Sequence, residues 1–563
     1  MSDQKLIGQN YTTPDIVAKV TGRAKYAEDF RADGMLFAKL LLSPMPHARV
    51  KSLDTSAALA LAGVAGILTA DDLPAPQGGP GGPPGGQAGA EVGLTNEPLY
   101  AGEPILAVAA ADETTAAEAI ERIAIEFEPL PFVLDPLDSL RPGSPNARLD
   151  GNTFVPGEKG PTIGTIKWTA QEFAEAAEGR LPMGEAPDKW SLGDVDAGFA
   201  EAALTLDETV VHQSLSHHAL EPRSALAYWQ NGKLYLYGST QSTARTVPAL
   251  ANWVGIDPAD VVFISEYTGG GFGSKISGAL VMRIPALLSK KTGRPVMMRV
   301  TRAEEHYFGR ARPGCHARIK MGFRKDGRIT ALDLFLVQDN GPYGRQSDHL
   351  TAAAVASLSY QPLAMRFRGI TVLTNTPPKS AQRAPGGEQA NAMIEPLMDK
   401  AARQLGLDRV AIRRINAPGM NAAFGPQPEK PGQPRAFVTS CFVQDAFDKA
   451  MALFGWEEKK KLSGRRHGTK VTGIGIGQGT YTAGSIGMDG LVVIRPDGKL
   501  YIHQGLGNLG THSFADTARA AADVLGMPWE RCEIVWGDTA KHLPWSSSQA
   551  GSQSTHAHTR ANY

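Results

Sequence analysis

The stretch Tyr267-Thr268-Gly269-Gly270-Gly271-Phe272-Gly273-Ser274-Lys275 decides how the rest of the chain is interpreted. It follows an apolar run, Val261-Val262-Phe263-Ile264, that predicts a buried strand. Clustered glycines lose much conformational entropy on folding, so they occur where backbone must approach a ligand or adopt a positive φ. The spacing matches neither the dinucleotide fingerprint nor the phosphate loop. The stretch therefore predicts either a ligand-contacting loop, with Phe272 over the ligand, or a glycine-rich turn packed between two elements.

Length and charge limit the class of protein. A chain of 563 residues suggests about three or four domains. Lys+Arg and Asp+Glu balance at 57 each, so no net charge favours nucleic acid or an anionic membrane surface. No apolar stretch approaches the roughly 20 residues of a membrane span, and the start has no secretory signal pattern. These features predict a cytoplasmic protein without a membrane span.

The spacing of the cysteines and histidines predicts no metal site. Cys315, Cys441 and Cys532 are far apart and form no paired motif, which argues against disulfides, a thiolate zinc site or an iron–sulfur cluster on this chain. His217 and His218 lack the spacing of a helical metal motif, so structural roles are expected for them.

The order of predicted elements indicates a mixed α and β (α+β) fold. Strands are expected at 35–42, 63–69 and 105–110, a helix at 114–125 and a strong helix at 388–405. Residues 74–89 are mainly Pro, Gly and Gln and predict a surface excursion. The last residues, 561–563, resemble the start of a helix, so a completing part is expected elsewhere. The predicted division is a first domain at 1–155, a linker or wrapping segment at 156–190, a second domain at 191–420, a connection at 421–470, and the incomplete start of a third domain at 471–563.

A second glycine-rich turn, Gly505-Leu506-Gly507-Asn508-Leu509-Gly510, matches the dinucleotide fingerprint and lies between a predicted strand and a helix at 513–525. Alone it suggests NAD or FAD. The expected acidic residue comes late, as Asp538, and little chain remains to complete such a sheet. The turn still predicts backbone N–H groups that can hold an anion.

Two further segments are candidates. Gln241 ends a predicted strand, where a neutral amide could hydrogen-bond an oxo or carbonyl group; the alternative is an ordinary surface amide. Arg383-Ala384-Pro385-Gly386-Gly387 precedes the helix at 388–405 and could offer N–H groups and a guanidinium to anionic atoms; the alternative is a simple turn.

Ordered blocks along nearly the whole chain resemble one family. They are Val20-Thr21-Gly22-Arg23-Ala24-Lys25-Tyr26, Tyr100-Ala101-Gly102-Glu103-Pro104, Gly193-Asp194-Val195-Asp196-Ala197-Gly198-Phe199, residues 218–222, Thr240-Gln241, residues 269–275, 383–386 and 405–416. Together they resemble the large molybdopterin-binding subunit of the xanthine oxidase and aldehyde oxidase family of molybdenum hydroxylases. The resemblance implies a hammerhead-type α/β domain followed by molybdopterin-binding α+β domains.

The resemblance also implies a cofactor and its contacts. The cofactor would be molybdenum with molybdopterin, as the cytosine dinucleotide if the source is bacterial. Gln241, Phe272, Arg383 and Arg345 would take part at the reacting centre. Cofactor contacts are expected from Gly270, Gly271, Phe272, Gly273, Arg383, Ala384, Gly507, Asn508, Gly510, Thr511, Gln553, Ser554 and Thr555.

The implied reaction is oxidative hydroxylation with water as the oxygen source and a glutamate as the base. Electrons would leave through partner subunits, an iron–sulfur protein and an FAD protein, because no iron–sulfur cluster or FAD is expected on this chain. The family's base lies beyond residue 563. Either a second polypeptide completes the site, which we expect, or the sequence is a fragment, or the subunit is not catalytic by itself.

Departures from the family pattern narrow the range of expected substrates. Ile276 stands where purine-oxidising members carry a glutamate, and residues 344–347 lack the cysteine of carbon monoxide dehydrogenases. An aldehyde or an electron-poor aromatic or heteroaromatic carbon is therefore expected. By the resemblance, Arg345 would orient a carbonyl or carboxylate group; the alternative is a solvated surface arginine. The turn at 508–511 also departs from the family's Gly-Gln-Gly. The alternatives are a non-catalytic scaffold or cofactor-holding subunit and a nicotinamide or flavin oxidoreductase.

Overall fold

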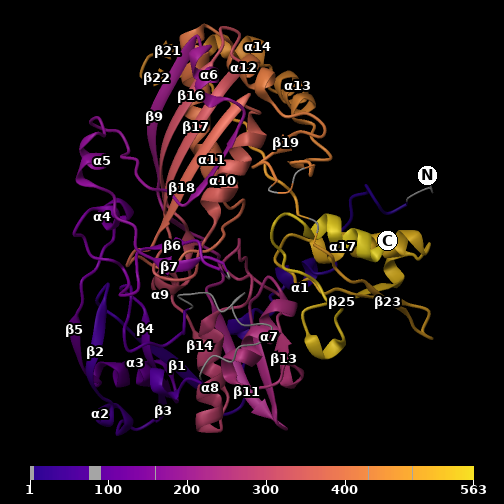
Figure 1. Cartoon of the computed structure of the whole chain (residues 1–563). Coiled ribbons are helices and arrows are strands. Elements are labelled where there is room, and N and C mark those ends of the chain that lie inside the picture. Colours follow the sequence, from indigo (N-terminus) through magenta and orange to yellow (C-terminus); the bar gives the residue numbers. More distant parts are fainter. Residues whose placement is uncertain (1–4, 75–90, 159, 429, 431, 485) are drawn as a thin grey trace.

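A computed structural model describes residues 5–74, 91–158, 160–428, 430, 432–484 and 486–563. Its elements form three lobes, of which two are stacked and the third lies beside their junction (Figure 1). The excursion predicted at residues 74–89 lies, apart from Pro74, outside the described residues. Within the described residues, no helix combines the length and the apolarity that a membrane crossing requires.

The lower lobe contains a seven-stranded mixed sheet with the order β13-β12-β11-β14-β1-β4-β3. Its strands are β1 (Leu36–Leu42), β3 (Val64–Leu68), β4 (Pro104–Ala110), β11 (Ser224–Gln230), β12 (Lys233–Gly238), β13 (Val261–Ile264) and β14 (Val296–Arg299). Strand β1 pairs in parallel with β14. The sheet is therefore continuous between strands from the first 155 residues and strands that follow residue 191.

Helices α7 (Thr243–Val254) and α8 (Arg283–Thr292) contribute to the apolar core of this sheet. Helix α3 (Glu113–Glu121) is capped by Asp112, whose side chain accepts from the backbone N–H of Thr115. The predicted continuation of α3 to residue 125 is wrong. Residues Ala124–Pro129 form β5, which pairs with β2 (Ala48–Asp54) and alternates apolar Ile125 and Phe127 with glutamates.

The upper lobe contains a second sheet, with the order β7-β6-β18-β17-β16-β9 and β8 beside β18. The strands are β6 (Thr153–Val155), β7 (Thr162–Gly164), β8 (Asp188–Leu192), β9 (Leu204–His212), β16 (Cys315–Phe323), β17 (Ile329–Asp339) and β18 (Ala364–Val372). Helices α10 (Asp348–Ser359) and α11 (Gly387–Leu405) bury apolar side chains against it. The strong helix predicted at 388–405 corresponds to α11.

The third lobe is built from β23 (Leu491–Ile494), β24 (Leu500–His503), β25 (Cys532–Val535) and helices α15 (Ser513–Asp516), α16 (Ala518–Val524) and α17 (Ser554–Asn562). The predicted helix at 513–525 is thus split in two. Residues 561–563 were expected to begin a helix, but Ala561 and Asn562 are the last residues of α17. Strands β24 and β25 are parallel, and the glycine turn at 505–510 lies between β24 and α15.

The remaining α-helices and strands lie within the lobes or between them. They are α1 (Ile16–Val20), α2 (Ser56–Leu59), α4 (Pro136–Leu140), α5 (Ala170–Ala174), α6 (Val195–Ala200), α9 (Arg302–Phe308), α12 (Arg409–Asn416), α13 (Val443–Phe454), α14 (Trp456–Lys459), β10 (Leu215–Ser216), β15 (Ala311–Arg312), β19 (Ala423–Phe424), β20 (Ala436–Phe437), β21 (Arg466–His467) and β22 (Lys470–Val471). The N-terminal segment crosses to the third lobe, where Asp523 accepts hydrogen bonds from the backbone of Lys5, Leu6 and Ile7.

Candidate functional site

The glycine loop at 269–273 follows β13 at the junction of the lobes. Gly270, Phe272 and Gly273 have φ of 91°, 53° and 116°, in the left-handed region. Among the described residues, the N–H groups of Gly270, Gly271 and Phe272 have no hydrogen-bond partner. Successive N–H groups in such a conformation form a concavity that suits an anion. Phe272 is 43% exposed, so its ring is not part of the core.

The other side of the loop is packed tightly. A Cβ at Gly271 would lie 2.5 Å from Oε1 of Gln241, and a Cβ at Gly273 would lie 1.9 Å from the carbonyl oxygen of Ala381. The loop thus combines both predicted features, a tight turn on one side and open backbone donors on the other.

Buried charges fix both ends of this loop. Oε2 of Glu221 accepts from the N–H of Gly269 at 2.8 Å and from Nζ of Lys275 at 2.9 Å. Nη2 of Arg223 donates to the carbonyl oxygen of Ser274 at 2.7 Å, and Arg223 pairs with Glu305. Burial lowers the pKa of Lys275 although the Glu221 carboxylate opposes this shift. Such buried pairs hold a geometry when all partners are present.

Gln241 is buried in contact with the loop. Its Oε1 accepts from the N–H groups of Gly273 at 2.8 Å and Lys275 at 3.2 Å. Its Nε2 donates to the carbonyl oxygen of Gln549, in the third lobe, at 2.9 Å. Gln241 is therefore not the surface amide of the alternative interpretation, and Nε2 retains one hydrogen without a described partner.

The segment Arg383–Gly387 lies directly beside Phe272. The N–H of Arg383 donates to the carbonyl oxygen of Phe272 at 2.7 Å, and Ala384 has a φ of 57°. Arg312, which is buried, donates to the carbonyl oxygen of Arg383 at 2.7 Å. These two hydrogen bonds hold the backbone of the predicted turn, while the side chain of Arg383 is exposed.

The second glycine turn pairs with the first. Tyr267 and Asn508 form a parallel bridge, and the N–H of Thr268 donates to the carbonyl oxygen of Asn508 at 2.9 Å. Gly507 donates to Oε1 of Gln549 at 3.2 Å. The side chain of Asn508 is buried and donates to Asp15 at 2.7 Å, so it supports the fold rather than facing open space.

The remaining predicted contacts of the third lobe differ in placement. Gly510 has a φ of 80° with open space where a Cβ would stand, and Thr511 bonds Ser513. Gln553 is buried, with Oε1 accepting from Ile486 and Nε2 donating to Ser547 and Ser548. Ser554 and Thr555 open α17. Gln553, Ser554 and Thr555 do not line the cavity described next.

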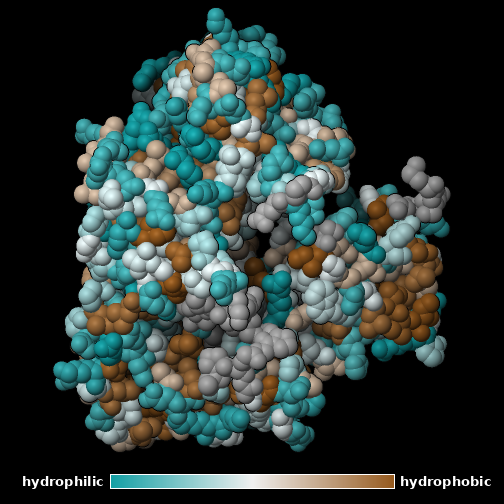
Figure 2. Space-filling view, in the orientation of Figure 1, coloured by the Kyte–Doolittle hydropathy of each residue, from teal (hydrophilic) through white to brown (hydrophobic). Residues whose placement is uncertain are grey.

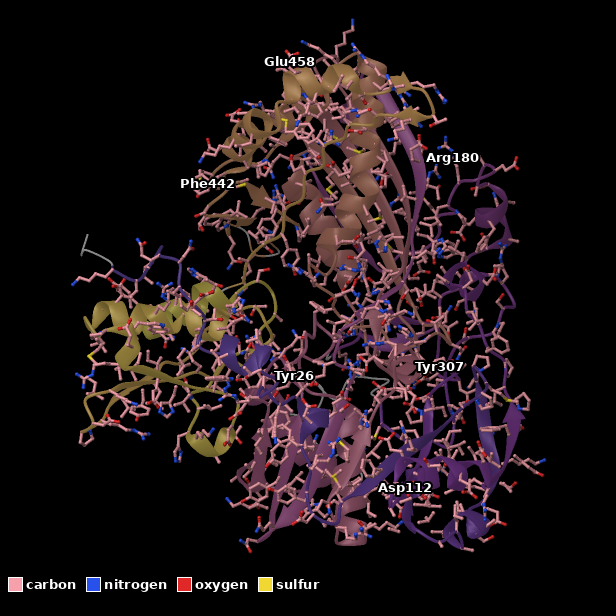
Figure 3. All side chains as sticks on the ribbon, turned by 180° about the vertical axis from the view of Figure 1, so that it is seen from behind. Tyr26, Asp112, Arg180, Tyr307, Phe442 and Glu458 are labelled. Atoms are coloured by element: carbon pink, nitrogen blue, oxygen red, sulfur yellow. The ribbon has the colours of Figure 1, made fainter. Side chains whose placement is uncertain are left out.

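A cavity of about 560 Å³ lies where these loops meet the N-terminal segment. Its walls include Lys19, Tyr26, Gly270, Phe272 and Gly510. The volume falls in the range of small-molecule and cofactor sites. Tyr26 lies where the third lobe meets the lower lobe (Figure 3). Figure 2 shows a recess between the third lobe and the stacked lobes.

Sequence reasoning missed Lys19, Glu28, Asp29 and Leu220 as wall residues. Tyr26 belongs to an N-terminal block that carried the family resemblance, but no local pattern placed that block at the cavity.

Arg345 lies in the turn after β17, close to the Arg383 segment but away from the cavity. A Cβ at Gly386 would lie 2.5 Å from the carbonyl oxygen of Asp348, three positions after Arg345. The guanidinium of Arg345 pairs with Asp188, which also binds Nε2 of His349 at 2.8 Å. Burial would raise the pKa of Asp188, but hydrogen bonds from His349 and Arg345 outweigh it and hold that pKa below its usual value.

His217, near the loop, has structural partners, whereas His218 lines the cavity. Nε2 of His217 bonds the carbonyl oxygen of Ala381 at 2.9 Å, and burial lowers the pKa of His217 to about 4. Over the described part of the chain, no three His, Cys, Asp or Glu side chains gather in a way that could hold a metal ion.

Three family models match the chain. The aldehyde oxidase and xanthine dehydrogenase a/b hammerhead domain matches residues 21–131. The molybdopterin cofactor-binding domain matches residues 178–417, and a second model of that description matches residues 449–563. The turn at 505–510 lies in this last region, which disfavours a nicotinamide or flavin fold there.

Two relatives and one solved structure are consistent with the family models. The chain is 27% identical to the probable hypoxanthine oxidase of Escherichia coli, over 95% of this chain and 57% of that protein. It is 28% identical to the nicotinate dehydrogenase large molybdopterin subunit of Eubacterium barkeri, over 81% of this chain and 99% of that subunit. The aldehyde oxidoreductase of Desulfovibrio gigas has the same fold, with a TM-score of 0.81 and 24% identity over 99% of this chain and 59% of that one.

The chain belongs to the xanthine oxidase family of molybdenum hydroxylases, with an N-terminal hammerhead domain followed by molybdopterin-binding domains. It spans 57% of the length of the first of these relatives. The residues present fit the family's cofactor. The family's cofactor carries phosphate and has no covalent attachment. A cavity of suitable size, two paired glycine turns and N–H groups left without a partner by the described residues suit such a group.

Proposed function

We propose that this chain is the molybdopterin-binding subunit of a molybdenum hydroxylase that oxidises an aldehyde or an electron-poor aromatic or heteroaromatic carbon with water as the oxygen source. The observation that carries the proposal is the row of N–H groups at Gly270, Gly271 and Phe272 that have no partner among the described residues. They lie beside a cavity that the second glycine turn helps to line. Bound molybdenum would supply the two-electron oxidation chemistry, which no side chain here provides.

The chain's own residues would bind and orient. Gln241 would direct its free Nε2 hydrogen at a cofactor ligand, and Phe272 would cover that face while Gly270 and Gly271 donate through backbone. Arg383 and Ala384 would add contacts from the opposite turn, whose backbone already touches Phe272. Gly507, Asn508, Gly510 and Thr511 would contribute backbone, and Gln553, Ser554 and Thr555 the start of α17. The cofactor is proposed to be the cytosine dinucleotide form.

Partners complete the proposed enzyme. Three isolated cysteines provide no cluster ligands, so electrons are proposed to pass to an iron–sulfur subunit and an FAD subunit in the cytoplasm. The catalytic glutamate is proposed to come from a second molybdopterin-subunit polypeptide. In support, a relative named as a large molybdopterin subunit is matched over 99% of its own length.

A second candidate is a non-catalytic, cofactor-holding subunit. It is favoured by two side chains expected at the site that are already paired within the protein, Asn508 with Asp15 and Arg345 with Asp188.

The two candidates are separated by turnover of the purified complex. A panel of aldehydes and nitrogen heteroaromatics is offered with a dye as electron acceptor, in isotopically labelled water. The hydroxylase predicts dye reduction and labelled oxygen in the product. A molybdenum-loaded complex that oxidises no member of the panel would favour the cofactor-holding subunit.

A further inference from the structure

The second glycine turn is held by a buried carboxylate of the N-terminal segment. Asp15, at the start of α1, is 1% exposed, and its Oδ2 accepts from Nδ2 of Asn508 at 2.7 Å. Lys19, one helical turn further along α1, pairs with the same carboxylate and donates to Oδ1 of Asn508 at 3.4 Å. Asp15 and Asn508 are 493 positions apart, so this contact joins the N-terminal segment to the third lobe.

The side chain of Asp15 does not cap its own helix. An aspartate at the N-cap ordinarily accepts from an N–H of the first turn and so stabilises the helix. Asp15 occupies the N-cap position of α1, but its side chain makes no capping hydrogen bond. Burial would raise the pKa of Asp15, but hydrogen bonds from Lys19 and Asn508 outweigh it and hold that pKa below its usual value. The carboxylate is therefore charged and directed at the glycine turn.

Asn508 transmits this contact to the backbone of its own turn. Its Oδ1 accepts from the N–H of Gly510 at 3.1 Å, and Gly510 has a φ of 80°. Leu509 and Gly510 line the cavity. The N–H groups of Leu509 and Thr511 have no hydrogen-bond partner among the described residues. The second turn thus offers backbone donors of the kind that suit an anion, as the first glycine loop does.

We infer that Asp15 is a positioning residue of the cofactor site, which acts through Asn508 to set the second glycine turn so that its N–H groups retain an anionic part of the cofactor. This inference rests on the proposed function, because it takes the cofactor to lie between the two glycine turns. Asp15 itself does not line the cavity, whereas Lys19 and Asn508 do. Its effect on the cofactor therefore has to pass through these two partners.

The test measures how firmly the purified complex retains its cofactor. Molybdenum and pterin are quantified before and after extended gel filtration, together with turnover per bound molybdenum. Asp15→Ala leaves Nδ2 of Asn508 buried without its acceptor, and should release the cofactor about tenfold faster than wild type. Turnover per bound molybdenum should change little. Asp15→Asn keeps an oxygen that can accept from Asn508 and should retain most of the cofactor.

A double-variant cycle tests whether Asp15 acts through Asn508. Asn508→Ala should also release the cofactor faster. Asp15→Ala/Asn508→Ala should release it no faster than the worse single variant, because both changes remove the same interaction. Effects that multiply in the double variant would overturn the proposed route. If Asp15→Ala does not assemble, Asn508→Ala tests the same hydrogen bond from its other side, and wild-type retention would overturn the inference.

Asp523→Ala is the control for a loosened N-terminal segment. Asp523, on α16, accepts from the backbone of Lys5, Leu6 and Ile7 and does not line the cavity. The variant should lower the thermal midpoint but release the cofactor at the wild-type rate. Equal release from Asp523→Ala and Asp15→Ala would reduce Asp15 to a general attachment between lobes and overturn its role at the turn.

Failure of this inference differs from failure of the proposed function. A loaded wild-type complex whose Asp15→Ala variant retains molybdenum as firmly would overturn the role of Asp15 alone. A wild-type complex that holds neither molybdenum nor pterin would overturn the proposed function and this inference with it.

Discussion

Gln241 and Gln549 join the lower lobe to the third lobe by two hydrogen bonds. Nε2 of Gln241 donates to the carbonyl oxygen of Gln549 at 2.9 Å, and the N–H of Gln549 donates to the carbonyl oxygen of Gln241 at 2.9 Å. The same side chain accepts from the glycine loop at Gly273. One amide thus sets the position of the loop and of the lobe that closes over it.

Replacing Gln241 with alanine should slow turnover while leaving the chain folded. The variant leaves the N–H groups of Gly273 and Lys275 without an acceptor, which costs about 1–3 kcal/mol. We expect a lower thermal midpoint and kcat reduced about tenfold or more. Gln230→Ala, at the exposed end of β11, is the control. Unchanged turnover in the loaded complex would remove Gln241 from the site.

Gly273→Ala should prevent correct loop formation. The new Cβ would lie 1.9 Å from the carbonyl oxygen of Ala381, at a φ of 116° that side chains rarely adopt. The expected result is a soluble protein whose molybdenum content falls well below that of wild type, measured by elemental analysis. Gly406→Ala, also at positive φ but with open space around the Cβ, controls for backbone strain alone. Equal loading of both variants would argue against the loop as a cofactor contact.

Lys275→Met alone should destabilise the protein more than the double variant Glu221→Gln/Lys275→Met does. The single variant leaves the carboxylate of Glu221 buried without its cation, which costs about 3–5 kcal/mol. Glu221→Gln combined with Lys275→Met removes both charges and should recover part of the loss. Denaturant midpoints of the three proteins test this. If the single variant were as stable as the double, the ion pair would not be holding the loop.

Glu103→Gln should stabilise the protein increasingly as pH rises. Burial raises the pKa of Glu103 from 4.5 to about 8, although hydrogen bonds from Tyr343 and Leu99 oppose this. Between these values the unfolded chain loses a proton that the folded chain keeps, so wild-type stability falls by about 1.4 kcal/mol per pH unit from this group. Glutamine is neutral in both states and avoids this loss.

Thermal midpoints measured at about pH 5 and about pH 8 check this sign. The advantage of Glu103→Gln over wild type should be larger at the higher pH, and Glu121→Gln, on the exposed face of α3, should show no such change. A larger advantage at the lower pH would contradict the raised pKa of Glu103.

Local features of the fold could be predicted from the sequence. Helix α11 and strands β1 and β13 follow periodicities of a few residues, and the glycine loop after β13 is marked by composition alone. Helix α10 was not predicted. Nine of its residues are buried, so it lacks the polar face that gives a helical period.

The arrangement of the site could not be predicted, because it depends on pairs that are distant in sequence. No local pattern links Tyr267 to Asn508 or Glu221 to Lys275. Asp188 lies in a segment predicted to be a linker, so its pairing with Arg345 had no signal in the sequence. That pairing changes the interpretation of Arg345 from a free cation to a compensated one.

The central claim is that this chain binds a molybdenum–molybdopterin cofactor between its two glycine turns. The most direct measurement is elemental analysis of the purified complex together with identification of the nucleotide released by acid hydrolysis. We predict about one molybdenum per chain and release of CMP. A complex without molybdenum or pterin, or one with NAD or FAD bound to this chain, would contradict the account.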